Sequence, residues 1–442
     1  MNNCLNINKK IKPFNKKILI DGDKSLSIRW ALLASQAKGK SKAYSLLKSE
    51  DVLDTLKCLK KLGIIIKWKN TYCEIYGKGL NGYTYKKNLT LNAGNSGTLG
   101  RLILGLLIHS KRKIKLIGDK SLSKRDFSRV TRPLKRFGAK FSQNQNKLPI
   151  SIIRSKFIKP INYFEDKGSA QCKSSVMLAA LNTQGETRIK AKKSRNHTEL
   201  LFKYLKIPIK IKKTKKYDFI KIKGKKEIKS FNYRIPSDIS SSAFFIVLTA
   251  LSNNSKLLIK NVNINSSRTG VLKILKKMGV KISTKNIKDY KGEKIADIFV
   301  KSSKNLTSIN CPSNLNSSAI DEFLIIFLIA AKAKGVSYFK KISELNQKES
   351  PRLKWGSKIL KMMGIKTVLT SDSLKIWGNP ELKINHLIKV KDYLKDHRVF
   401  MMCVIAGLTF GGNWKIYDKD SINTSFPSFL KKIKELNENK KR

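Results

Sequence analysis

The sequence has few acidic residues. Of its 442 residues, 30 are Asp or Glu and 93 are Lys or Arg, which leaves a formal net charge of +63. Such an excess is common in nucleic-acid-binding proteins. The lysines, however, are spread along the whole chain, and no RNP, zinc-finger, KH or basic-zipper pattern accompanies them. We therefore interpret the charge as a solvated basic surface that attracts anionic substrates, and we do not expect a nucleic-acid partner.

Long apolar segments are also absent. The longest apolar run, from residue 323 to 331, has nine residues, whereas a membrane-spanning helix needs about 20. The N-terminus, MNNCLNINKKIKPF, has no apolar segment of the kind found in secretory signals. The sequence thus predicts neither a membrane span nor secretion.

Cysteine and histidine are scarce. None of the six cysteines forms a C-x-x-C pair, and none of the four histidines lies near enough to complete a zinc pattern. We predict reduced, mostly buried thiols in a cytoplasmic protein, and no metal site.

Two patterns recur along the chain. The first is an amphipathic helix that ends at a glycine and runs into a strand, with glycines at 63, 138, 279 and 364. A further copy lacks the glycine, ELLFKYLKIPIKI, and a sixth helix, PSFLKKIKELN, closes the chain. The second pattern is a polar opening followed by an almost wholly apolar helix. Its six copies begin at Ser25, Gly97, Ser169, Ser240, Asp321 and His397.

Both patterns share a period near one sixth of the chain, because successive openings lie 71 to 81 residues apart. We therefore predict six α/β units, each with one amphipathic helix on a sheet and one buried apolar helix. The N-termini of the buried helices present free N–H groups, and several carry a cation in the first turn. A purely structural helix gains nothing from such a cation, so the pattern predicts a site for a polyanionic small molecule or for two anions together.

Several segments in order along the chain resemble the 5-enolpyruvylshikimate-3-phosphate (EPSP) synthase family. The segments are DGDKSLSIRWALLAS, GNSGTLGRL, IGDKSLSKR, SAQCKSSVMLAAL, SRNHTELL, IPSDISSSAFF, SRTGVLKILKKMG, AIDEF, ELNQKESPRLK, DHR and TSFPSF. The resemblance implies a two-domain inside-out α/β barrel of six βαβαββ-type units with buried central helices. Residues 1–21 and 237–442 would form one domain, and residues 22–236 the other.

The resemblance also implies a reaction: transfer of the enolpyruvyl group of phosphoenolpyruvate to the 5-hydroxyl of shikimate 3-phosphate, by addition and elimination, with release of phosphate. It places the chain in the shikimate pathway to chorismate and the aromatic amino acids, as a cytoplasmic monomer without cofactor or metal. Catalysis would involve Asp321 as the base, the Lys348–Glu349 pair at the methylene, and Lys24.

Two sets of binding residues follow from the same match. Shikimate 3-phosphate would be bound by Lys24, Ser25, Arg29, Ser169, Gln171, Ser194, Arg195, Asp321 and Lys348. Phosphoenolpyruvate would be bound by Lys24, Gly97, Arg125, Gln171, Arg352 and Arg398.

This sequence departs from the family pattern at several positions beside these residues. They are Asp126 for proline, Asn196 for aspartate, Ser237 for glycine, Asn346 for an arginine-like residue and Pro351 for an acidic residue. Pro351 matters most, because it lies between Glu349 and Arg352 and lacks a backbone donor.

Two other functions are alternatives to the EPSP synthase reaction that the resemblance implies. One is the sister enolpyruvyl transferase that acts on UDP-N-acetylglucosamine, but the stretch KLIGDKSLSKRD lacks the cysteine that it usually carries. The other is a polyanion-binding relative that has lost catalysis, which the charge of +63 and Pro351 would favour.

Overall fold

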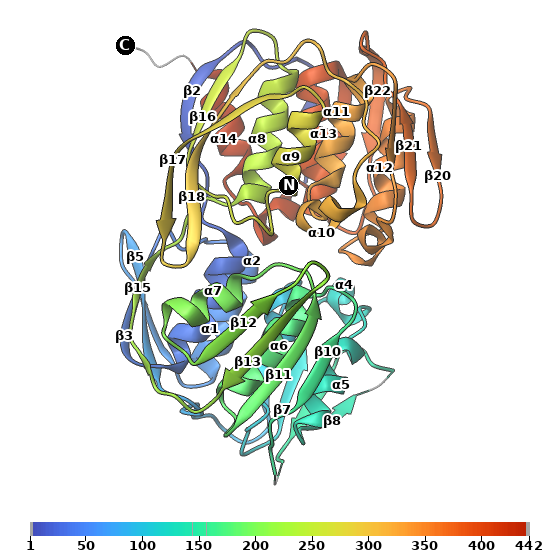
Figure 1. The fold of residues 1–442 in the computed structure, drawn as a ribbon. Helices are drawn as coiled ribbons and strands as arrows, with labels where there is room; N and C mark the ends of the chain where they lie inside the picture. Colours follow the sequence, from blue (N-terminus) through green and yellow to red (C-terminus); the bar gives the residue numbers. More distant parts are fainter. Residues whose placement is uncertain (1–2, 144, 156, 439–442) are drawn as a thin grey trace. The chain divides into compact units, whose positions relative to one another are not determined.

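The structure is a computed structural model that describes residues 3–143, 145–155 and 157–438. The chain divides into two compact units (Figure 1). Unit 1 comprises the described residues of Met1–Asp21, Pro236–Lys288 and Lys294–Arg442, and unit 2 comprises Gly22–Ile235 and Asp289–Glu293. No helix among the described residues is long and apolar enough to cross a membrane.

Unit 1 is built on three sheets. The first has the order β1-β23-β22, with β1 (Cys4–Ile7), β22 (Ile384–Val390) and β23 (Gly411–Tyr417). The second has the order β17-β18-β16-β2, with β2 (Asn15–Leu19), β16 (Lys256–Asn263), β17 (Lys281–Tyr290) and β18 (Glu293–Lys301). The third has the order β19-β21-β20, with β19 (Val336–Phe339), β20 (Thr367–Leu369) and β21 (Leu374–Trp377).

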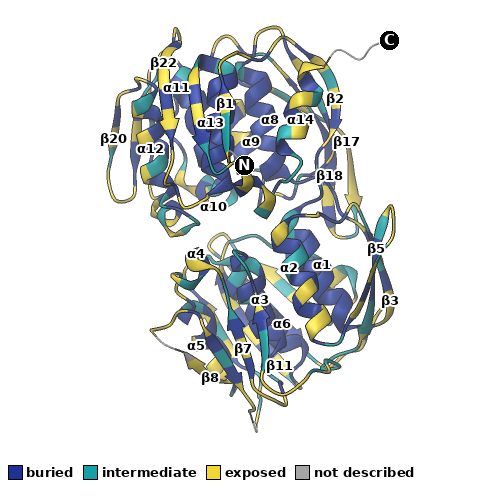
Figure 2. Cartoon of the chain, turned by 180° about the vertical axis from the view of Figure 1, so that it is seen from behind, coloured by how far each residue is buried: buried dark blue, intermediate teal, exposed yellow. Residues whose placement is uncertain are grey.

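Three apolar helices form the centre of unit 1: α8 (Ile239–Leu251), α11 (Phe323–Lys332) and α13 (His397–Phe410). Figure 2 shows them almost wholly buried. A helix that is apolar on every side must be surrounded by protein, and here sheets and outer helices surround it. The outer helices are α9 (Gly270–Lys277), α12 (Arg352–Met362) and α14 (Phe429–Asn437), with the short α10 (Asn316–Ala319), η1 (Ser313–Leu315), η2 (Ser343–Gln347) and η3 (Lys419–Thr424).

Unit 2 also has three sheets. The first has the order β14-β3-β5-β4, with β15 also on β3: β3 (Ala37–Tyr44), β4 (Ile65–Trp68), β5 (Tyr72–Lys78), β14 (Ile228–Lys229) and β15 (Asn232–Arg234). The second has the order β6-β7-β9-β8: β6 (Leu89–Asn92), β7 (Ile114–Ile117), β8 (Lys140–Gln143) and β9 (Ile150–Ile153). The third has the order β10-β11-β13-β12: β10 (Asn162–Glu165), β11 (Glu186–Lys192), β12 (Ile209–Lys213) and β13 (Tyr217–Lys223).

The centre of unit 2 again consists of apolar helices, namely α1 (Lys24–Gln36), α3 (Gly97–Leu106) and α6 (Ala170–Leu181). The outer helices are α2 (Glu50–Lys61), α5 (Ser128–Arg136) and α7 (His197–Tyr204), with the short α4 (Lys120–Ser123). The sequence prediction that all six apolar segments are buried helices is confirmed, although α11 begins at Phe323, two residues after Asp321.

The predicted glycine turns are confirmed as well. Gly63, Gly138, Gly279 and Gly364 each follow an amphipathic helix with φ between 82° and 104°, a conformation that glycine adopts without steric cost. In the copy that lacks a glycine, Lys206 follows α7 with φ 53°. The turn is therefore kept even where the residue is unfavourable.

The tip of the β17–β18 hairpin, residues 289–293, belongs to unit 2. Glu293 accepts a hydrogen bond of 2.6 Å from Nδ1 of His197, and both side chains are fully buried. Tyr290 accepts a hydrogen bond from the Arg234 main chain. His197 therefore connects α7 to this hairpin.

Candidate active site

In unit 2, the residues predicted to bind substrate lie at the N-termini of the apolar helices. Lys24 is the first residue of α1, Gly97 the first of α3, and Ser169 the N-cap of α6. Ser169 Oγ accepts from Cys172 N, which satisfies one of the N–H groups at that end. The remaining N–H groups and the helix dipole favour an anion there.

The side chains of α1 are held by neighbouring helices. Lys24 Nζ lies 2.8 Å from Asp51 Oδ2 in α2. Arg29 is buried, and its guanidinium donates to Thr198 Oγ1, Ser174 Oγ and the Ser25 carbonyl at 2.8 to 3.1 Å. The protein thus fixes the orientation of Arg29 before any ligand binds.

Gly97, Arg125 and Gln171 come together around Arg101. A Cβ at Gly97 would lie 2.8 Å from Arg101 Nη1 and 2.9 Å from Arg125 Nη1, so glycine makes room for both guanidinium groups. Arg101 Nη1 also donates to Gln171 Oε1 at 2.8 Å, and Gln171 Nε2 donates to Thr98 Oγ1 at 3.1 Å. Two arginines side by side favour binding of an anion.

Ser194 and Arg195 lie in the turn between β11 and α7, and in the part of the chain that the structure describes, the buried Ser194 Oγ has no hydrogen-bond partner. A buried hydroxyl in that state gains by binding a ligand or water.

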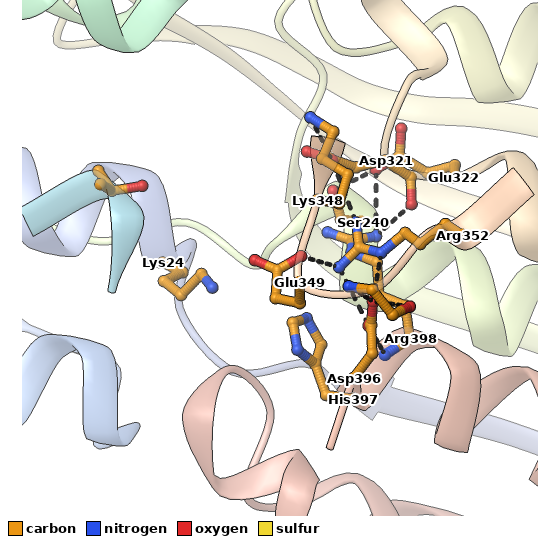
Figure 3. Close-up of polar contacts among 12 residues, drawn as sticks. Lys24, Ser240, Asp321, Glu322, Lys348, Glu349, Arg352, Asp396, His397 and Arg398 are labelled. Atoms are coloured by element: carbon orange, nitrogen blue, oxygen red, sulfur yellow. Dashed lines mark hydrogen bonds and ion pairs between the residues drawn. The ribbon is translucent and has the colours of Figure 1, made fainter. Parts of the chain in front are cut away.

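In unit 1, the structure brings five predicted residues into one cluster (Figure 3). They are Asp321, Lys348, Glu349, Arg352 and Arg398. Asp321 Oδ1 lies 3.4 Å from Lys348 Nζ and 3.5 Å from Arg352 Nη1, and Glu349 pairs with Arg352 Nη2. The N-cap of α11 is Glu322 rather than Asp321, and it makes no side-chain cap bond. Asp321 therefore faces the cluster and is not the cap of α11.

Exposure differs sharply within this cluster. The side chains of Asp321, Lys348 and Glu349 are 14%, 26% and 20% exposed, whereas Arg352 is 2% exposed. The first three side chains are therefore accessible to a substrate, and Arg352 is held beneath them.

Asp396 holds Arg352 in place and is a residue that sequence reasoning missed. Its carboxylate accepts from Arg352 Nε at 2.8 Å and Nη2 at 3.1 Å, and it also accepts from Ser350 and from Arg398 N as the cap of α13. Burial alone would raise the pKa of Asp396, but Arg352 outweighs it and holds the pKa below its usual value. The sequence signals were its position directly before an apolar helix and its place in the DHR segment, and neither pointed to Arg352 as its partner.

Arg398 lies on the first turn of α13. Its Nη1 donates to the Asp321 carbonyl at 2.6 Å and lies 3.6 Å from Glu322 Oε1. The guanidinium is therefore anchored beside Asp321. His397, the preceding residue, is within 3.3 Å of Thr424 Oγ1.

Comparison with known proteins shows the family. The family model for EPSP synthase (3-phosphoshikimate 1-carboxyvinyltransferase) matches residues 8–433. The chain belongs to this family. A 3-phosphoshikimate 1-carboxyvinyltransferase from Ruthia magnifica is 39% identical over 434 residues, which cover 97% of this chain and 98% of the relative. One from Thermoanaerobacter sp. strain X514 is also 39% identical, with coverage of 97% and 99%.

Solved structures agree with membership in the EPSP synthase family. The EPSP synthase from Acinetobacter baumannii superposes with a TM-score of 0.86 at 34% identity and covers 98% of both chains. The enolpyruvyl transferase NikO from Streptomyces tendae has a TM-score of 0.77 at 12% identity, and this shows the likeness of fold alone. The fold is thus the mixed α/β, two-domain fold of EPSP synthases, and neither competing function is favoured.

Proposed function

We propose that this chain carries out the EPSP synthase reaction with the residues assembled above. The enolpyruvyl group of phosphoenolpyruvate passes to the 5-hydroxyl of shikimate 3-phosphate, and phosphate is released. Addition forms a C–O bond at the enol carbon while a proton reaches the methylene carbon. Elimination then removes that proton and breaks the bond to phosphate. The observation that carries the proposal is the cluster of Asp321, Lys348 and Glu349 around buried Arg352.

Asp321 acts as the base that takes the proton of the 5-hydroxyl. Its carboxylate is partly exposed, so it can reach a substrate hydroxyl, and Lys348 Nζ lies 3.4 Å from its Oδ1. Lys348 and Glu349 move the proton at the methylene carbon, and Lys24 from unit 2 serves both substrates.

Arg352 needs one rearrangement to bind phosphoenolpyruvate. Its three nitrogens already contact the carboxylates of Asp396, Glu349 and Asp321. We infer that the substrate carboxylate replaces Glu349 and Asp321 on Arg352, while Asp396 keeps its two hydrogen bonds. The exchange would free Glu349 and Asp321 for proton transfer at the moment when substrate arrives. Arg398 and Arg125 complete the phosphoenolpyruvate site, with Gly97, Gln171 and Lys24.

Shikimate 3-phosphate is assigned chiefly to unit 2. The support is the fixed guanidinium of Arg29 and the helix openings at Ser25 and Ser169. Gln171, Ser194 and Arg195 are further contacts of the same proposal, with Lys24, Asp321 and Lys348.

The finer architecture and setting are also part of the proposal. We assign the two units as the two domains of a six-unit inside-out barrel, with one sheet and one apolar helix in each repeat. Six unpaired cysteines support a reducing, cytoplasmic setting, and we propose a monomer that works without a cofactor.

The decisive experiment measures phosphate release from phosphoenolpyruvate with shikimate 3-phosphate or UDP-N-acetylglucosamine as acceptor. We expect release with the first acceptor and none above background with the second. Release with the second acceptor alone would contradict the proposal. Binding of nucleic acid without any turnover would contradict it in favour of a polyanion-binding relative.

A further inference from the structure

A line of buried polar residues leads away from Arg398 into the interior of unit 1. It contains Glu322, Ser240 and Arg268, which come from three segments of the chain. None of the three belongs to the substrate-binding sets above, yet all are buried, with exposures of 0%, 3% and 2%. Burial of two charged side chains far from solvent is costly unless each has a partner.

Arg268 begins the line. It lies just before α9, and its Nη2 donates to Ser240 Oγ at 2.6 Å and to Asp238 Oδ1 at 3.2 Å. Asp238 is the N-cap of α8 and also accepts from Ser240 N at 2.7 Å. Arg268 is therefore fixed to the first turn of α8.

The direction of the next hydrogen bond follows from the chemistry of the groups. A guanidinium can only donate, so Ser240 Oγ must accept from Arg268. The single hydroxyl proton of Ser240 is then directed to Glu322 Oε1, the other partner of that oxygen. Figure 3 shows Ser240, Glu322 and Arg398 in this arrangement.

Glu322, which accepts the Ser240 hydrogen bond, also contacts Arg398. Its Oε1 accepts from Ser240 and lies 3.6 Å from Arg398 Nη1, while its Oε2 is buried and has no hydrogen-bond partner among the described residues. The same Arg398 Nη1 donates to the Asp321 carbonyl. One carboxylate oxygen thus meets both the hydroxyl and the guanidinium, so its place sets where the guanidinium can lie.

We infer that Glu322, Ser240 and Arg268 are positioning residues that hold the Arg398 guanidinium beside Asp321, ready for phosphoenolpyruvate. The inference rests on the proposed function, which assigns Arg398 to that substrate. A guanidinium held in place before binding loses less conformational freedom on binding than a mobile one. Loosening these contacts should therefore weaken phosphoenolpyruvate binding, while binding of shikimate 3-phosphate, to which the proposal does not assign Arg398, should be little affected.

Ser240→Ala tests the inference, with Ser252→Ala as the matched control. Both substitutions remove a buried hydroxyl at an end of α8, but Ser252, the C-cap residue after Leu251, donates to the Leu248 carbonyl at the opposite end of the helix from Ser240. We expect Ser240→Ala to raise KM for phosphoenolpyruvate about tenfold, which corresponds to about 1.4 kcal/mol. KM for shikimate 3-phosphate should stay within about twofold, and Ser252→Ala should leave both constants near wild type. Ser240→Thr, which keeps the hydroxyl, should restore most of the loss.

Two results would overturn the inference: equal phosphoenolpyruvate KM values for Ser240→Ala and Ser252→Ala, or an equal rise of both KM values in Ser240→Ala. Glu322→Gln is the second variant, and it should show the same selective rise, since the amide cannot balance the charge of Arg398. Failure of the proposed function is seen separately, as absence of phosphate release by the wild-type protein.

Discussion

Pro351 lies at a position where the missing backbone N–H of proline costs little stability. It is the residue directly before α12, and the first N–H groups of a helix have no partner within the helix. Asn346 Oδ1 accepts from Leu353 N, and Asp126 accepts from Ser128 N and Oγ at the start of α5. Three of the departures from the family pattern are thus compatible with the helix starts that carry Arg352 and follow Arg125.

At the same scale, Asp321→Asn separates catalysis from binding. The amide keeps the shape of the side chain but cannot take a proton, so we expect kcat to fall by at least about a hundredfold. KM for both substrates should change by less than about threefold. Steady-state phosphate release measures both constants, and Asp372→Asn, at an exposed position of unit 1, serves as control. A wild-type kcat would remove Asp321 from the role of base.

The cysteines offer a second test of single residues. Cys4 is partly exposed and the other five are buried. Burial raises the pKa of Cys58 and Cys73 to about 12 and of Cys311 to about 11, so their thiolate fraction at pH 8 is very small. We expect one thiol to react rapidly with a chromogenic disulfide in the native protein and six in denaturant. Cys4→Ser should abolish the rapid phase, and two or more rapid thiols would refute the burial argument.

At the scale of elements, a single methyl group in the first turn of α3 tests the proposed phosphoenolpyruvate site. Gly97→Ala would place a Cβ 2.8 to 2.9 Å from the guanidinium nitrogens of Arg101 and Arg125. Side-chain ends can move, so we expect little loss of stability, but a rise in KM for phosphoenolpyruvate of about tenfold (about 1.4 kcal/mol).

The control for this prediction is Gly100→Ala on the same helix. Its Cβ would meet the Phe127 ring at 3.3 Å. Kinetics with varied phosphoenolpyruvate and a thermal melt distinguish the two variants. Equal KM values for phosphoenolpyruvate in the two variants would show that Gly97 and the adjacent guanidinium groups are not part of the substrate site.

Sequence periodicity predicted the elements better than the contacts between them. Apolar runs identified all six buried helices, and the glycines identified the turns after four outer helices, because both signals are local. The Asp396–Arg352 pair spans 44 residues and the Ser240–Glu322 bond spans 82. Such pairs depend on how helices pack, which no local pattern records. The resemblance named Arg352 and Arg398, but the carboxylates that hold them became visible only with the fold.

At the scale of the whole molecule, several of the few acidic side chains are buried in its interior. Glu199, Glu293, Glu322 and Asp396 are all buried in ion pairs with cationic or histidine partners. The acidic residues left on the surface are therefore fewer than the 30 of the sequence, while most lysines remain exposed. Each buried pair with Lys or Arg removes one charge of each sign, so the net excess of cations, and the basic field that it creates, is unchanged by this burial.

That field should act on the substrates, which both carry several negative charges. Raising KCl from 20 to 200 mM shortens the screening length from roughly 20 Å to roughly 7 Å. We expect kcat/KM to fall about tenfold over this range, because long-range attraction of the anions is screened. The change should lie in KM, since kcat depends on groups already in contact with bound substrate. Initial rates of phosphate release measure both, with sucrose at equal osmolarity as the uncharged control. A constant kcat/KM would mean that the +63 charge has no part in substrate capture and serves only the solvated surface.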